Sequence, residues 1–201
     1  MSRWANRAPM KRSCSLAALV LALLALAWLA FGGAPHAASA APLAQDRVEI
    51  DTTLGKIVVA LDRRRAPVTV ANFLGYVNRH FYDNGSFFRA VPGFVIQGGN
   101  KARELPSDPR IRLETPLATG LRNVDGAISM ARTPDPDSAT SEFFICDGPQ
   151  PALDGTPDQP GYAAFGRVIV GMNVVRAIIR QPAAEQQLLV PVKILRIVRL
   201  H

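Results

Sequence analysis

Eight short runs of apolar residues, separated by turns and proline-containing loops, constrain this fold more than any other feature of the chain. Most of them alternate apolar and polar residues, which is typical of half-buried strands. They occupy residues 48–53, 56–61, 86–91, 94–99, 126–132, 142–146, 162–169 and 192–200. Only two segments, 67–79 and 172–180, repeat apolar residues at helical spacing. The chain is therefore predicted to be mainly β.

Many strands and few helices favour an antiparallel barrel or sandwich. Two helices could close the two ends of a barrel, and an eight-stranded barrel is just wide enough to be filled by its own side chains. The intervening stretches 100–116, 133–141 and 147–161 are aperiodic and contain prolines, so they are predicted to be loops. A functional site would then lie on the outer surface of the barrel, not in its lumen.

The first forty residues have the pattern of a secretory signal. A basic start precedes an uncharged stretch from Ser13 to Phe31, and Ala38-Ser39-Ala40 supplies the small residues that signal peptidase reads. We predict cleavage after Ala40, a short linker over 41–47 and a single domain over 48–201. The alternative is an uncleaved membrane anchor, because the apolar run approaches the roughly 20 residues that span a bilayer.

Removing the signal removes most of the positive charge. Four of the 23 Lys and Arg residues lie in it and none of the 16 Asp and Glu residues, so the net charge falls from +7 to +3. No dense basic cluster or nucleic-acid-binding motif remains, and no nucleic-acid partner is expected.

The cysteine and histidine content limits the chemistry further. After cleavage only Cys146 is left, so no internal disulfide can form, and its apolar run favours a buried inert thiol over a reactive one. His80 and His201 are far apart, and no Cys/His cluster has metal-ligand spacing. No metal or other cofactor is expected.

The run from Phe87 to Gly99 carries the residues of greatest chemical interest. Arg89 lies in an apolar strand, so its guanidinium must reach a wet face or a partner, and Gln97 on the next strand could hydrogen-bond it. Phe94 would add an aromatic wall. Judged by residue type alone, an ordinary surface arginine beside a core strand is the alternative.

The wider pattern resembles the cyclophilin family. The run F-x-R-x-x-P-G-F-x-x-Q-G-G over 87–99 is similar to the family signature, and similar segments follow in order at 128–132, 141–145, 153–155 and 162–168, with a further one at 66–73. The resemblance extends from about Val48 to Leu200. It implies an eight-stranded antiparallel closed β-barrel, capped by two α-helices, with an active groove on its outer face.

The resemblance also implies site roles and partners. Arg89 would be catalytic, with Gln97 holding it and meeting the substrate backbone. The substrate-binding residues would be Phe94, Val95, Ala131, Arg132, Glu142, Phe144, Leu153 and Tyr162. The implied activity is peptidyl-prolyl cis-trans isomerisation, without cofactor or covalent intermediate, on proline-containing exported polypeptides. The segment from Ala131 to Thr133 and the signal look like the exported bacterial branch, so a monomeric periplasmic protein is expected.

Three positions depart from the family pattern. Phe88 replaces a frequent His, but strand alternation should point it away from Arg89. Glu142 replaces Gln and could pair with Arg89 if it faces the groove. Ala152 replaces Trp or Phe, so the groove should be more open there and cyclosporin should bind weakly.

Three other functions are alternatives. A binding module of the same fold could have lost turnover through Glu142 and Ala152. A hydrolase would need a nucleophile elbow, which Ser129 and Ser141 lack. A lipocalin-like carrier would need a hollow barrel, whereas the Phe-rich strands indicate a filled one.

Overall fold

Eight antiparallel strands close into a barrel in the computed structural model, which describes residues 46–104 and 107–200. The predicted signal segment lies outside the described residues. The barrel strands are β1 Arg47–Thr52, β2 Gly55–Leu61, β3 Gly85–Val91, β4 Val95–Gly99, β5 Ala127–Met130, β6 Phe143–Cys146, β9 Ala164–Val170 and β11 Gln187–Leu200. Their order is β1-β2-β9-β5-β6-β4-β3-β11, and pairing of β1 with β11 closes the ring. The predicted fold class is confirmed.

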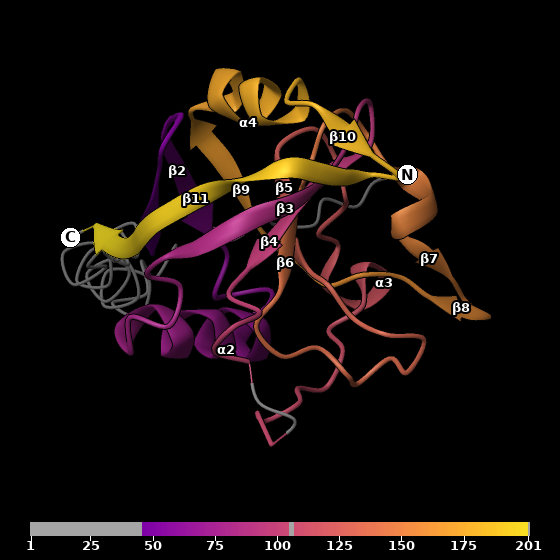
Figure 1. Ribbon diagram of the computed structural model, residues 1–201. Helices are drawn as coiled ribbons and strands as arrows, with labels where there is room; N and C mark the ends of the chain where they lie inside the picture. The colour runs from indigo at the N-terminus through magenta and orange to yellow at the C-terminus, as the bar shows by residue number, and fades with distance from the viewer. Residues whose placement is uncertain (1–45, 105–106, 201) are drawn as a thin grey trace, which may run out of the picture. The chain divides into compact units, whose positions relative to one another are not determined.

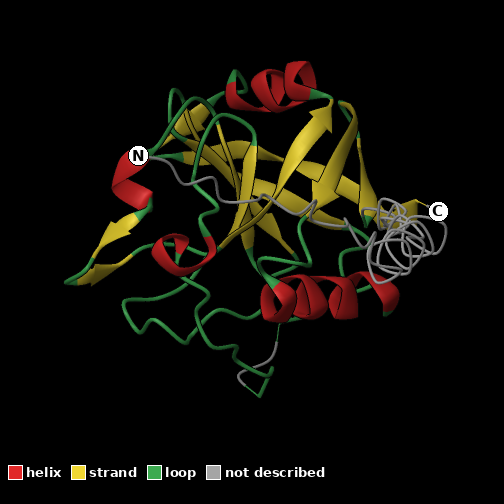
Figure 2. Ribbon diagram, turned by 180° about the vertical axis from the view of Figure 1, so that it is seen from behind, coloured by secondary structure: helices red, strands yellow, loops and turns green. Residues whose placement is uncertain are grey.

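Two helices cover opposite ends of the barrel (Figures 1 and 2). Helix α2 spans Pro67–Asn78 and helix α4 spans Met172–Ile179, close to the predicted segments. Pro67 opens α2 at a position whose N–H has no partner inside a helix. Gly171 precedes α4 with a φ of 96°, and a Cβ there would lie 2.3 Å from the Lys56 carbonyl oxygen. Only glycine fits this approach of the helix to β2.

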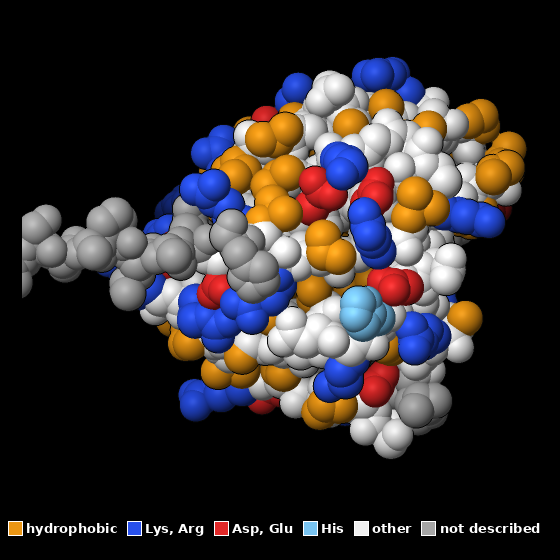
Figure 3. All heavy atoms as spheres, turned by 90° about the vertical axis from the view of Figure 1, so that its left-hand side faces the viewer, with side chains coloured by type: hydrophobic (Ala, Val, Ile, Leu, Met, Phe, Trp, Pro, Cys, Tyr) orange, Lys and Arg blue, Asp and Glu red, His pale blue; other side chains and the backbone are white. Residues whose placement is uncertain are grey.

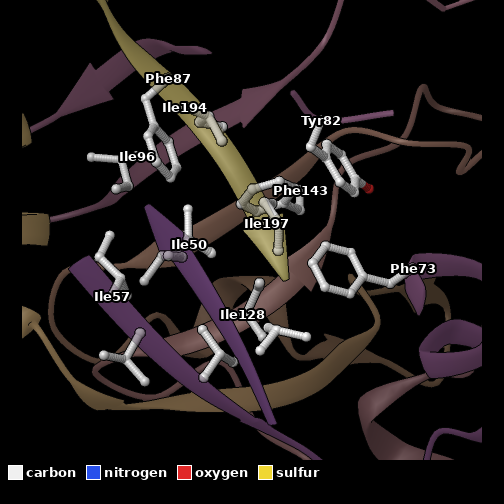
Figure 4. Close-up of a cluster of buried hydrophobic side chains, with 14 of the residues drawn as sticks. Ile50, Ile57, Phe73, Tyr82, Phe87, Ile96, Ile128, Phe143, Ile194 and Ile197 are labelled. Atoms are coloured by element: carbon white, nitrogen blue, oxygen red, sulfur yellow. The ribbon is translucent and has the colours of Figure 1, made fainter. Parts of the chain in front are cut away.

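The barrel lumen is filled by aromatic and branched aliphatic side chains from both the strands and α2 (Figure 4). Phe73 of α2 lies 5.6 Å from Phe143 and 5.4 Å from Tyr82, measured between ring centroids. Phe87 reaches the same cluster, 5.8 Å from Phe143. These side chains are almost completely buried, and among the described residues they occupy the lumen as in the close-packed interior of a protein. The lipocalin-like alternative is therefore excluded.

Short elements that the sequence did not reveal lie between the predicted strands. They are helix α3 Pro116–Thr119, a 3-10 turn at Pro151–Leu153, and a two-stranded ribbon of β7 Gly155–Thr156 with β8 Gln159–Pro160. All are four residues or fewer, too short for a periodic signal. Strand β5 also ends at Met130, so Ala131 and Arg132 lie just beyond the strand that was predicted to include them.

The last strand begins five residues earlier than predicted. β11 starts at Gln187 and forms a hairpin with β10 Ala183–Ala184. Pro191 lies where the register against β3 shifts, between the pairs Gln187–Arg89 and Val192–Phe87. A bulge has no ladder hydrogen bond for proline to break. This early start brings the hairpin tip to Arg89.

The surface carries mixed charge. Figure 3 shows a face on which Lys and Arg side chains are interspersed with Asp and Glu. One example is Asp46, whose two carboxylate oxygens each lie 2.7 Å from an arginine, Arg63 and Arg199. Across residues 46–104 and 107–200, no helix has the length and apolar character needed to span a bilayer.

Candidate functional site

A groove of about 340 Å³ opens on the outer face of the barrel. Nine of the ten predicted site residues line it: Arg89, Phe94, Val95, Gln97, Ala131, Arg132, Phe144, Leu153 and Tyr162. They come from β3, β4 and β6, from the turn between β3 and β4, from the loop after β5, from the 3-10 turn and from the segment before β9. Since the lumen is filled, an outward groove is the place where strand residues can meet a ligand. The tenth residue, Glu142, is not part of the lining.

Arg89 lies half-buried in this groove with three of its N–H groups engaged. Its Nε and Nη2 donate to Gln186 Oε1 at 3.0 and 2.6 Å, and its Nη1 donates to Gln97 Oε1 at 3.3 Å. The guanidinium carbon also lies 5.9 Å from the centre of the Phe94 ring. A guanidinium has five N–H donors, so two remain without a partner among the described residues. The predicted contact with Gln97 is present, whereas the contact with Gln186 was missed.

Glu142 interacts with Gln97 and makes no ion pair with Arg89 in the described part of the chain. Its Oε2 accepts from Gln97 Nε2 at 2.7 Å, which orients the Gln97 amide with its oxygen toward Arg89. Burial raises the pKa of Glu142, and the hydrogen bond from Gln97 opposes that rise. The pairing with Arg89 that was considered for a groove-facing Glu142 is therefore absent, and Gln97 lies between the two side chains, hydrogen-bonded to both.

The floor of the groove is apolar. Val95 and Phe144 belong to a buried cluster with Cys146, and Leu153 and Tyr162 pack against it. The Phe144 and Tyr162 rings meet nearly edge to face, with centroids 5.6 Å apart. These apolar side chains lie beside the Arg89 guanidinium, so the groove can take a compact apolar group next to a hydrogen-bond acceptor.

Arg132 forms part of the rim through backbone contacts. Its guanidinium donates to the carbonyls of Gly161 and Pro160 at 3.1 and 2.6 Å, and to that of Thr133 at 2.8 Å. It also lies 4.7 Å from the centre of the Tyr162 ring. These contacts join the two loops that flank the groove.

Comparisons with known proteins agree with this geometry. The sequence model of the family described as cyclophilin type peptidyl-prolyl cis-trans isomerase/CLD matches residues 47–199. The chain belongs to the cyclophilin family. Peptidyl-prolyl cis-trans isomerase A of Dickeya dadantii is 45% identical to this cyclophilin over 130 residues, which are 63% of this chain and 67% of the relative. An Acinetobacter baylyi peptidyl-prolyl cis-trans isomerase is 40% identical over 150 residues, 73% of this chain and 78% of the relative.

Solved structures show the same fold. The crystal structure of a cyclophilin-type peptidyl-prolyl cis-trans isomerase from Cryptosporidium parvum has a TM-score of 0.69 and 25% identity, covering 78% of this chain and 98% of that chain. The same parasite enzyme was also crystallised in the presence of the dipeptide Ala-Pro, with a TM-score of 0.68. This cyclophilin is a peptidyl-prolyl cis-trans isomerase, as the sequence predicted, and its family binds proline-containing peptides.

The hydrolase alternative has no support in the cyclophilin barrel. Ser129 Oγ donates to Asn123 Oδ1 at 2.6 Å, and Ser141 Oγ donates to Glu104 Oε1 at 3.0 Å. Both serines are fully buried, and the single histidine in the described residues, His80, is exposed. Nor do the described residues bring three or more His, Cys, Asp or Glu side chains together as a metal site.

Asn123 is a second residue that sequence analysis missed. It is buried, and its Nδ2 donates to the Leu153 carbonyl at 3.0 Å and to the Tyr162 carbonyl at 3.4 Å. Its backbone N–H donates to Asp154 Oδ1 at 2.7 Å. A single side chain therefore ties together two segments of the groove wall. Asn123 lies in the stretch 117–125, for which no element is predicted, and it gave no signal because asparagine is common in irregular segments.

The remaining departures have structural explanations. Phe88 is half-buried under the Lys101 ammonium, 3.8 Å from the ring centre, and does not line the groove. Ala152 is exposed in the 3-10 turn, next to the groove residue Leu153. Cys146 is fully buried, and burial raises the pKa of its thiol to about 12, in keeping with the predicted inert thiol.

Proposed function

We propose that the groove around Arg89 is where this isomerase binds and turns over X-Pro segments, with Arg89 as the catalytic residue. The observation that carries the proposal is a guanidinium with two N–H groups unengaged among the described residues, lying beside an apolar pocket. Phe94, Phe144 and Leu153 would hold the proline ring there. The Ala-Pro dipeptide used with the Cryptosporidium parvum enzyme is a ligand of this class.

The chemistry needs no nucleophile, acid, base or metal. An amide resists rotation by about 18–20 kcal/mol because its nitrogen lone pair is delocalised. As the X-Pro bond twists, the prolyl nitrogen becomes pyramidal and its lone pair becomes an acceptor. Arginine stays protonated at any cellular pH and can donate to that lone pair only in the twisted state. A charge-assisted hydrogen bond contributes roughly 1.5–3 kcal/mol, so the apolar pocket and the exclusion of water must supply the rest.

Gln97 and Glu142 would support this step. Gln97 accepts from Arg89 through Oε1 and donates to Glu142 through Nε2, so its amide orientation is set from both sides. The remaining acceptor capacity of the Gln97 oxygen is available to an N–H of the substrate backbone.

The test compares isomerisation of an Ala-Pro peptide by the wild type, Arg89→Ala and the control Arg64→Ala. Arg64 is exposed in the loop before α2 and lies outside the groove. We expect Arg89→Ala to lose most of the acceleration and Arg64→Ala to retain it. Full activity in a folded Arg89→Ala protein would refute the role of Arg89 while leaving the family activity intact.

We also propose that the enzyme assists folding of exported proteins in the periplasm, as a monomer cleaved after Ala40. The support is the signal-like pattern of the first forty residues and the bacterial source of the relatives. Fractionation followed by N-terminal sequencing should find a periplasmic product beginning at Ala41. A membrane-bound product that retains residue 1 would favour the uncleaved anchor, and light scattering tests the monomer.

A further inference from the structure

The tip of the β10–β11 hairpin lies against the catalytic arginine. Glu185 and Gln186 form this tip with φ values of 48° and 70°, a left-handed pair typical of tight two-residue turns. The Ala90 N–H donates to the Gln186 carbonyl at 3.0 Å, and Gln187 pairs with Arg89 in the sheet. The backbone of Gln186 is thus attached to β3 through its own carbonyl and through the residue that follows it.

The Gln186 side chain holds one edge of the Arg89 guanidinium. Its Oε1 accepts from Nε at 3.0 Å and from Nη2 at 2.6 Å, while Gln97 Oε1 accepts from Nη1 at 3.3 Å. Because a guanidinium only donates, the amide oxygens of both glutamines must face it. Two acceptors on different nitrogens fix both the plane and the rotation of the fork.

This arrangement determines which donors stay available. Three of the five N–H groups donate to the two glutamines: the one on Nε, one of the two on Nη2 and one of the two on Nη1. The two that remain are the second N–H of Nη1 and the second N–H of Nη2. We propose that Gln186 is a positioning residue that aims these two N–H groups into the groove. The inference rests on the proposed catalytic role of Arg89. Without Gln186 the arginine would swing between orientations, and only some of them would place a donor at the prolyl nitrogen.

The test replaces Gln186 with methionine, which has nearly the same length and shape but no strong acceptor. Gln187→Met is the matched control, because Gln187 is the exposed next residue and no hydrogen bond of its side chain is present among the described residues. Both variants keep a non-glycine residue, so the backbone strain of the turn is unchanged. The kcat and KM of each are measured with the wild type and Arg89→Ala in the same series, and the Arg89 Nε–H resonance is followed by NMR.

We expect Gln186→Met to lower kcat about tenfold or more with KM nearly unchanged, and to shift the Arg89 Nε–H resonance. Gln187→Met should change neither. Suppose that Arg89→Ala loses its activity as expected. The positioning role would then be overturned if Gln186→Met kept the wild-type kcat, or if Gln187→Met lost as much kcat as Gln186→Met. If Arg89→Ala itself kept its activity, the proposed role of Arg89 would fail, and this inference with it.

Discussion

Glu114 caps helix α2 from a distant loop, and removing it should destabilise the barrel without altering the groove. The N-cap residue of α2 is Ala66, whose side chain cannot accept a hydrogen bond. Instead the Glu114 carboxylate accepts from the backbone N–H groups of Val68 and Thr69, at 3.0 and 2.8 Å, and from the Thr69 hydroxyl at 2.6 Å. A negative charge there also complements the helix dipole.

The cost of Glu114→Ala is dominated by Thr69, because Val68 is 45% exposed and its N–H can find water, whereas Thr69 is completely buried. Each buried polar group left without a partner costs about 1–3 kcal/mol, so losing the acceptor for two groups should cost about 2–6 kcal/mol. For a domain of this size that lowers the melting temperature by roughly 5–25 °C. Glu114→Gln keeps one acceptor oxygen and should cost about 1–2 kcal/mol.

The assay is urea and thermal unfolding of both variants, with Glu185→Ala as a control that removes an exposed carboxylate elsewhere. The kcat/KM well below the melting temperature should stay at the wild-type value, since Glu114 does not line the groove. A double-mutant cycle with Thr69→Val should show coupling of about 1 kcal/mol. If Glu114→Ala costs no more than Glu185→Ala, the cap contributes nothing and the reasoning is wrong.

Four further outcomes are expected. Burial raises the pKa of Glu142, so its charged form destabilises the folded state. Glu142→Gln should therefore raise the free energy of unfolding at neutral pH. Urea unfolding should show that this gain vanishes as the pH falls below the unfolded pKa of about 4.3. Cys146 should resist thiol reagents in the folded protein and react once urea unfolds it, because burial raises its pKa to about 12. Asn123→Leu should raise KM and lower the melting temperature together, since it releases both groove segments. The residues that line the groove include Arg89 and Arg132 and no carboxylate. Glu-Pro peptides should therefore have a kcat/KM a few-fold above that of Lys-Pro peptides at low salt. Both the Arg132→Gln substitution and high salt should reduce this difference.

The period of the apolar residues was sufficient to predict a mainly β chain with two helices, whereas the choice of a closed barrel over a sandwich came from the family resemblance. Alternation at Val48 and Ile50 placed both in the core, and the helical spacing of Val70 and Phe73 predicted a helix that covers one barrel end. Both periodicities can be read from the sequence because they follow from the local geometry of a strand and of a helix. The elements that were missed, α3 and the β7–β8 ribbon, are too short to show a period.

The candidate site divides in the same way. A resemblance in sequence was enough to bring Arg89, Gln97 and seven of the other groove residues together, because most of them lie in one run or in ordered segments close to strands. Glu142 was predicted for the groove, but its place behind Gln97 depends on the pairing of β4 with β6, which no local pattern records.

The sequence by itself determined the strand and helix periods, the buried thiol and the residue types of the groove, since each depends on neighbours along the chain. Only the tertiary structure decided the contacts of Gln186 with Arg89 and of Glu114 with α2, which join residues 97 and 45–46 positions apart. The physical reason is that such contacts form only after the barrel closes. A glutamine in a turn or a glutamate in a loop has the same local conformational preference whether or not the folded chain places a distant hydrogen-bond donor beside it.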